Sequence, residues 1–76
     1  MKISKAKVEL QNQAFSLLEI RKNPSRIEEY IVILYKHDGK SSILAYENNT
    51  ALSSPDLEHI ILMLKEIGFR KAKIYF

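Results

Sequence analysis

The segment EYIVILYKH, residues 29 to 37, limits more than any other stretch what this chain can fold into. Its β-branched and aromatic side chains favour a strand. Asp38-Gly39 follows, a dipeptide that accepts the positive φ angles of a two-residue type I′ turn, and KSSILAYEN, residues 40 to 48, returns as the partner strand. Such a turn places Leu34 opposite Ile43. The sequence therefore predicts a β-hairpin over residues 29 to 48.

A helix is predicted over residues 55 to 67, because both of its ends are marked. Ser54 suits the N-cap, Pro55 suits the first helical position, and Gly68 can adopt the left-handed conformation just past the end. Leu62 points away from the apolar stripe of this helix, among charged residues. The stripe recurs at helical spacing and comprises Leu57, Ile60, Ile61, Leu64 and Ile67.

The two ends of the chain complete the expected fold. RKAKIYF, residues 70 to 76, reads as a strand that returns beside an earlier strand in parallel. The first twenty residues fit either a helix or strands, and we interpret residues 4 to 12 as a short helix and residues 14 to 22 as a strand before the Asn23-Pro24-Ser25 turn. The predicted fold class is α+β. It is one domain with a mixed sheet of three or four strands and the main helix packed on one face.

The run ALSSPDLEHIILMLKEIGF, followed by a short strand, also carries a resemblance. The motif residues are Leu52, Ser54, Leu64, Ile67, Gly68 and Phe69. The pattern resembles a family of small, mostly gammaproteobacterial proteins, classed as a domain of unknown function, in which strand, turn, strand, a helix ending in LGF, and strand recur. The resemblance covers about the last two thirds of the chain. It implies a fold and a bacterial cytosolic setting, and it implies no activity.

Reactive chemistry has little support in the sequence. The chain has no Cys, so disulfides and thiolate metal ligands are excluded. His37 and His59 are separated by 22 positions, with no carboxylate at ligand spacing, and each of the two glycines has a structural role. We therefore predict no catalytic, metal or cofactor site and no enzyme activity. No apolar segment of signal-peptide length is present, so a cytoplasmic protein is expected.

Two basic clusters indicate nucleic-acid binding as one hypothesis. Twelve Lys and Arg residues against nine Asp and Glu residues give a formal net charge of +3. The two clusters would have to meet on one side of the sheet to form a binding patch. A charge of this size also serves solubility, and basic strands also protect a sheet edge. The candidate contacts are Arg21, Lys22 and Arg26 around one turn, and Arg70, Lys71 and Lys73 in the last strand.

Protein association is the other hypothesis, and we prefer it. The predicted hairpin is apolar on both faces, and one short helix covers only one of them. A homodimer would bury the second face, with Leu62, Tyr35 and Tyr46 as candidate interface residues. The alternative is that the N-terminal segment covers that face and Leu62 is a single exposed leucine. The predicted function is a small non-enzymatic binding or interaction module.

Overall fold

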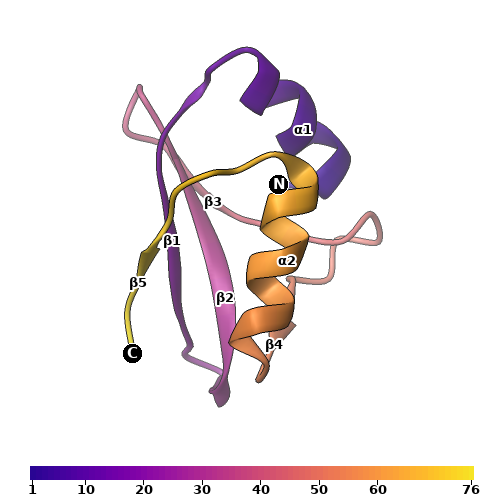
Figure 1. The fold of residues 1–76 in the computed structure, drawn as a ribbon, viewed down its shortest axis with the longest axis vertical. Coiled ribbons are helices and arrows are strands. Elements are labelled where there is room, and N and C mark those ends of the chain that lie inside the picture. Colours follow the sequence, from indigo (N-terminus) through magenta and orange to yellow (C-terminus); the bar gives the residue numbers. More distant parts are fainter.

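The computed structural model describes residues 1–76 and confirms the α+β class (Figure 1). Two helices accompany one mixed sheet of five strands, in the order β3-β2-β1-β5, with β4 also paired to β2. Neither helix is long and apolar enough to cross a membrane. The elements are α1 (Ile3–Gln11), β1 (Phe15–Asn23), β2 (Arg26–Lys36), β3 (Ser41–Ile43), β4 (Ser53–Ser54), α2 (Leu57–Ile67) and β5 (Lys73–Ile74).

The antiparallel pair of β1 and β2 dominates the sheet. The Asn23-Pro24-Ser25 turn joins the two strands, and the Ser25 N–H donates to the Asn23 side-chain oxygen at 2.9 Å, which is a hydrogen bond typical of such turns. The predicted strand at residues 14 to 22 and the helix at residues 4 to 12 are confirmed as β1 and α1. The following strand begins at Arg26 rather than at Glu29.

The predicted turn between β2 and β3 is wrong by one residue. Three residues, His37 to Gly39, form the loop, because the Lys36 N–H donates to the Lys40 carbonyl oxygen at 2.8 Å. Gly39 has φ +88°, so the loop is a turn closed by a left-handed glycine, the usual three-residue alternative for this dipeptide. Ile33 therefore faces Ile43, and the residue facing Leu34 is Ser42 rather than Ile43.

The predicted strand at residues 40 to 48 is also interrupted after Ile43. Leu44 is fully buried, and Ala45 pairs with Ala51 across a second tight turn in which Asn49 has φ 71°. The chain then returns to β2 as β4. The Leu44 N–H still donates to the Val32 carbonyl oxygen at 2.9 Å, and beyond it Ala45 bridges Lys2 and Ala51 instead of β2.

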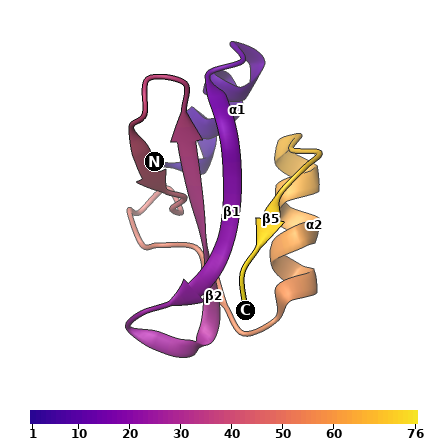
Figure 2. The ribbon, with the colours of Figure 1, turned by 90° about the vertical axis from the view of Figure 1, so that its left-hand side faces the viewer.

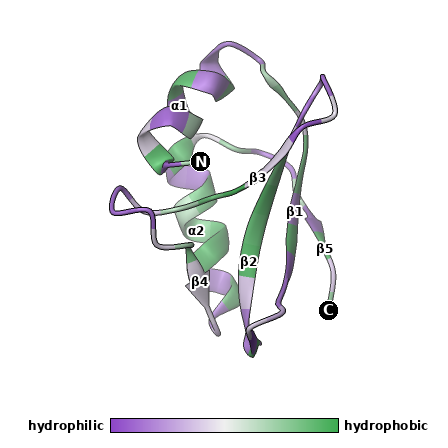
Figure 3. Ribbon diagram, turned by 180° about the vertical axis from the view of Figure 1, so that it is seen from behind, coloured by the Kyte–Doolittle hydropathy of each residue, from purple (hydrophilic) through white to green (hydrophobic).

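The core lies between one face of the sheet and both helices. Leu18 and Ile20 of β1 stand directly opposite Leu34 and Val32 of β2, and all four are buried. Figure 3 shows the apolar ribbons of β2 and α2 close together in this layer. The buried cluster comprises Ala6, Leu18, Ile20, Val32, Leu34, Leu44, Leu52, Ile60 and Leu64. The two helices thus share one side of the sheet, which we call its inner face.

The opposite side, which we call the outer face, has no helix in front of it in Figure 2. Its side chains belong to residues that alternate with the core residues along each strand. They are Leu17, Glu19 and Arg21 of β1, Ile31, Ile33 and Tyr35 of β2, and Ile43 of β3.

Helix α2 begins after Asp56, not after Ser54 as predicted. The Asp56 carboxylate accepts hydrogen bonds from the Glu58 and His59 backbone N–H groups, which makes it the N-cap. The Ser54 hydroxyl oxygen instead accepts from the Asp56 N–H at 3.1 Å. Two good capping residues stand close together here, and the one nearer the apolar stripe caps the helix.

The predicted C-terminal end of α2 and its apolar stripe are confirmed. Gly68 has φ +120°, and the Phe69 N–H donates back to the Leu64 carbonyl oxygen at 3.0 Å. Ile60 and Leu64 are buried, whereas Leu62 is 55% exposed on the far side of the helix, as expected. The chain then crosses to β1 and pairs in parallel, but β5 is only Lys73–Ile74, much shorter than the predicted strand.

Candidate functional site

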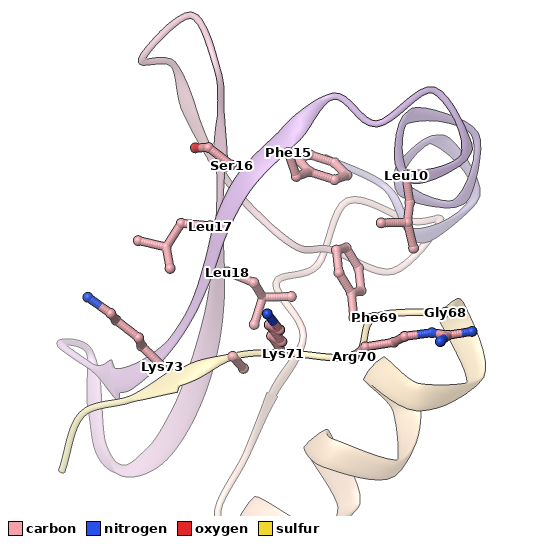
Figure 4. A pocket seen from close by; sticks show the side chains of 11 residues that line it. Leu10, Phe15, Ser16, Leu17, Leu18, Gly68, Phe69, Arg70, Lys71 and Lys73 are labelled. Carbon is pink, nitrogen blue, oxygen red and sulfur yellow. The ribbon is translucent and has the colours of Figure 1, made fainter.

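A groove opens where the chain between α2 and β5 runs apart from β1. Strand β5 pairs with β1 only at Glu19 and Ile20, so the earlier part of β1, Phe15 to Leu18, has no strand on this edge. The groove has a volume of about 820 Å³ and is lined by both segments and by Leu10 of α1 (Figure 4). Its floor is apolar, because Phe15 and Phe69 pack with ring centroids 5.7 Å apart.

The exposed edge of β1 presents a free hydrogen-bond donor. The Ile20 carbonyl accepts from the Tyr75 N–H at 2.8 Å, so the backbone groups of Ile20 point away from β2. Backbone groups of alternate residues point the same way along a strand, so the Leu18 N–H points into the groove. It meets no acceptor there. An N–H on a strand edge without an acceptor is open to pairing with another chain, which marks this position.

The opposite edge of the sheet is partly covered by the N-terminal residues. Beyond β3, Ala45 forms a bridge with Lys2, and the Ile3 N–H donates to the Ala45 carbonyl oxygen at 2.9 Å. The N-terminal residues therefore cover the edge just beyond β3. Since uncovered edges invite pairing with another chain, the Phe15 to Leu18 stretch is an accessible place for such pairing.

Three cations follow the rim of the groove. Arg70, Lys71 and Lys73 are exposed, and none of them forms an ion pair with a carboxylate. Figure 4 shows Lys71 over the groove, Lys73 near Leu17, and Arg70 directed away from the other two. The groove therefore combines an apolar floor, a free backbone donor and a positive rim.

A polar cluster occupies the outer face next to the groove. Glu19 is only 5% exposed, and its carboxylate accepts hydrogen bonds from the Arg21 guanidinium at 2.8 Å and the Tyr35 hydroxyl at 2.9 Å. The Arg21 guanidinium also lies over the Tyr75 ring, 4.2 Å from its centroid. These side chains supply one another's hydrogen-bond partners, so the cluster stabilises the outer face.

The hydrogen bonds of this cluster shift its pKa values. The Arg21 bond, helped by the Tyr35 bond and opposed by burial, holds the pKa of the Glu19 carboxyl below its usual value. The Tyr35 hydroxyl donates to a carboxylate, which raises the pKa of that hydroxyl. The Glu19 carboxyl therefore stays ionised to a lower pH in the folded protein than in the unfolded chain.

The first predicted basic cluster does not form one patch. Arg21 is held by Glu19 on the outer face, whereas Lys22 lies over the Tyr30 ring at 5.1 Å, on the inner side. Arg26 pairs with Glu29 at 3.4 Å near the turn. Of this cluster only Arg21 lies beside β5, so the second cluster, along the groove, stands essentially by itself.

The three predicted interface residues are not brought together. Tyr35 belongs to the outer face and bonds to Glu19, while Leu62 projects from α2 on the helical side of the molecule. Tyr46 lies in the tight turn after β3, where the predicted strand is interrupted. His37 and His59 are exposed at separate places, and no three His, Cys, Asp or Glu residues gather in a group that could hold a metal ion.

Sequence reasoning identified the cations of the groove but not the groove. The sequence signal was present in part, because Arg70, Lys71 and Lys73 follow the Gly68 helix end and precede apolar residues. The point at which the chain separates from β1 depends on tertiary packing. No protein-family model, curated protein or solved structure matches this chain.

Proposed function

We propose that this protein is a small, non-enzymatic binding module that takes up a segment of another protein in the groove beside β1. The observation that carries the proposal is the free Leu18 N–H on an unpaired strand edge, above an apolar floor. Strand edges of this kind bind extended chains through main-chain hydrogen bonds, and neighbouring pockets then select side chains. The cytoplasmic setting expected from the sequence belongs to the same proposal.

The size of the groove supports a short protein segment as its ligand. The unpaired stretch of β1 has the length of four residues, Phe15 to Leu18, or about 13 Å at the rise of an extended strand. The volume of the groove, about 820 Å³, falls in the range of sites that enclose a small ligand or a few side chains.

Nucleic-acid binding has weaker support. Three of the six candidate contacts, Arg21, Lys22 and Arg26, already interact with Glu19, Tyr30 and Glu29, and the Tyr75 ring is covered by a guanidinium. Only Arg70, Lys71 and Lys73 of the six cations keep no partner, and the Tyr75 ring beside them is already covered, although affinity for single strands depends on phosphate contacts and on stacking.

Self-association is the second candidate, and one observation favours it. Ile33 and Ile43 face each other in an apolar strip on the outer face, with Leu17 of β1 diagonal to Ile33, and Ile43 is 45% exposed. The strip is narrow because the Glu19 cluster occupies the face beside it. A dimer through this strip would disappear in an Ile43→Glu variant, which sedimentation velocity detects.

A peptide-display selection tests the proposed function. Random peptides are selected against the wild-type protein, and the enriched peptides are then measured against Leu17→Asp and Leu62→Asp variants. Leu17 lines the groove and Leu62 is exposed on α2, so each change places one charge on a leucine away from the buried core. Ile43→Asp is measured as well, because Leu17 also lies beside the outer-face strip and Ile43 does not line the groove. The proposal predicts that Leu17→Asp abolishes binding and that Ile43→Asp and Leu62→Asp retain it. Loss with Leu62→Asp alone would move the binding surface to α2, and no enrichment at all would refute the proposal.

A further inference from the structure

The groove also restricts the chemistry of its partner, an inference that rests on the function proposed above. We infer that the partner is an extended acidic segment, in which carboxylate side chains alternate with apolar ones and which adds to β1 as a further strand. Three features of the groove lead to this conclusion: the direction of the free donor, the two kinds of side chain on either side of it, and the unpaired charges of the rim.

The free donor requires an extended partner. The Leu18 N–H needs a carbonyl oxygen that approaches along the edge of β1. A helical segment cannot supply one from its middle, because its carbonyl groups are bonded within the helix. An extended segment presents free carbonyl and N–H groups along its whole length. Main-chain pairing beside β1 is therefore the natural way to satisfy this donor.

The surroundings of the donor predict an alternating ligand. Successive side chains of a strand point to opposite sides, so every second residue of an added strand would face the inner side of the groove. That side holds Leu10, Phe15 and Phe69, all partly buried and apolar. The residues between would face Leu17 and Lys73, with Lys71 at the mouth (Figure 4). Apolar residues fit the first set and polar residues fit the second.

The charges of the rim select an acidic ligand over a basic one. Lys71 and Lys73 have no carboxylate partner in the protein. The carboxylates nearby are already engaged, since Glu19 is bonded to Arg21 and Glu9 pairs with Lys36 at 3.1 Å. A ligand carboxylate therefore meets two free ammonium groups, and complementary charge of this kind favours both the encounter and the register.

The test uses three synthetic peptides, each labelled with a fluorophore and measured by fluorescence anisotropy. The first alternates Glu with Val over eight residues, the second alternates Lys with Val, and the third is the first with a methyl group on every backbone nitrogen, so that both of its edges are blocked. A labelled single-stranded oligonucleotide is included. We expect the Glu-Val peptide to bind and the Lys-Val peptide to bind at least roughly tenfold more weakly. Backbone methylation should abolish binding, because it blocks strand pairing.

Variants of the protein locate the binding. A Lys71→Glu, Lys73→Glu double variant should bind the Glu-Val peptide at least roughly tenfold more weakly at about 50 mM salt, with a much smaller difference at about 500 mM salt. A Lys5→Glu, Lys40→Glu double variant serves as the matched control, since both lysines are exposed and neither lines the groove. Circular dichroism checks that each variant is folded.

The possible failures are distinguishable. Equal binding of the methylated peptide would overturn strand addition, and equal binding of the Lys-Val peptide would overturn the acidic partner. Equal binding of the Lys-Val peptide would leave the proposed function standing, because a peptide still binds. Equal binding of the methylated peptide would remove the role of the Leu18 N–H, on which the proposed function also rests, and the display-selected peptides, measured against Leu17→Asp, then decide whether the groove binds peptides at all. If the oligonucleotide binds and no peptide does, both proposals are wrong and the cations serve nucleic acid.

Discussion

Truncation of Leu44 and of Ile43 tests which face of the β2–β3 pair belongs to the core. The two residues are neighbours, but Leu44 is fully buried and Ile43 is 45% exposed on the outer face. A shift of one residue in the register exchanges their positions, because side chains alternate along a strand. The two-residue turn expected from Asp38-Gly39 would put Ile43 opposite Leu34, in the core, and Leu44 outside.

The structure predicts a large difference between the two variants. Leu44→Ala removes a fully buried side chain and leaves a cavity, which costs about 2 to 5 kcal/mol. Ile43→Ala removes a side chain that is almost half in water and leaves no closed cavity, so its cost is about 1 kcal/mol. A chain of 76 residues has a free energy of unfolding of about 4 to 11 kcal/mol, so the first loss is a large part of the total.

Urea unfolding followed by circular dichroism measures both losses. With a slope of about 1 kcal/mol per molar, Leu44→Ala should lower the unfolding midpoint by roughly 2 M or more, and Ile43→Ala by roughly 1 M. Leu44→Val serves as a milder change if the alanine variant does not fold. A larger loss for Ile43 than for Leu44 would refute the three-residue loop and restore the two-residue turn.

Two further predictions concern the loop glycines and the Glu19 cluster. Gly68→Ala should destabilise the protein by about 1 kcal/mol more than Gly39→Ala in thermal unfolding. Both glycines have positive φ, but only at Gly68 would the added Cβ meet Leu10, at 3.2 Å. Equal losses of stability would show that this contact does not matter. For Glu19, whose pKa is lowered on folding, the stabilisation is present above its unfolded pKa of about 4.3 and is lost as the pH falls through the folded pKa. Glu19→Gln should therefore lower the free energy of unfolding near neutral pH and much less in acid, whereas a Glu66→Gln control on α2 should leave it unchanged at both. A loss for Glu19→Gln that does not depend on pH in urea unfolding would show that the charge of Glu19 is not its cause.

Local chemistry explains the part of the fold that was predictable. The apolar stripe of α2, its left-handed glycine and the Asn23-Pro24-Ser25 turn depend on residues within a few positions, and each appears as expected. The register of β3 could not be derived in this way. Asp38-Gly39 suits both a two-residue and a three-residue loop, and the burial of Leu44 against distant helices decides between them.

The candidate site was less predictable for a related reason. Arg70, Lys71 and Lys73 stand out in the sequence as a basic cluster, but their use depends on where the chain meets β1. Pairing begins only at Glu19, and this single fact creates both the groove and the free donor at Leu18. Tyr46 was predicted to lie in a strand and to face a partner, but β3 ends at Ile43 and Tyr46 lies in the turn beyond it.

An NMR titration of the isotope-labelled protein with the Glu-Val peptide tests the central claim most directly. The account predicts the largest amide shift changes at Phe15 to Leu18 and Gly68 to Lys73, with slower solvent exchange of the Leu18 N–H as it gains an acceptor. Changes centred on Leu62 or on the Ile33–Ile43 strip, with the exchange of the Leu18 N–H unaltered, would contradict it.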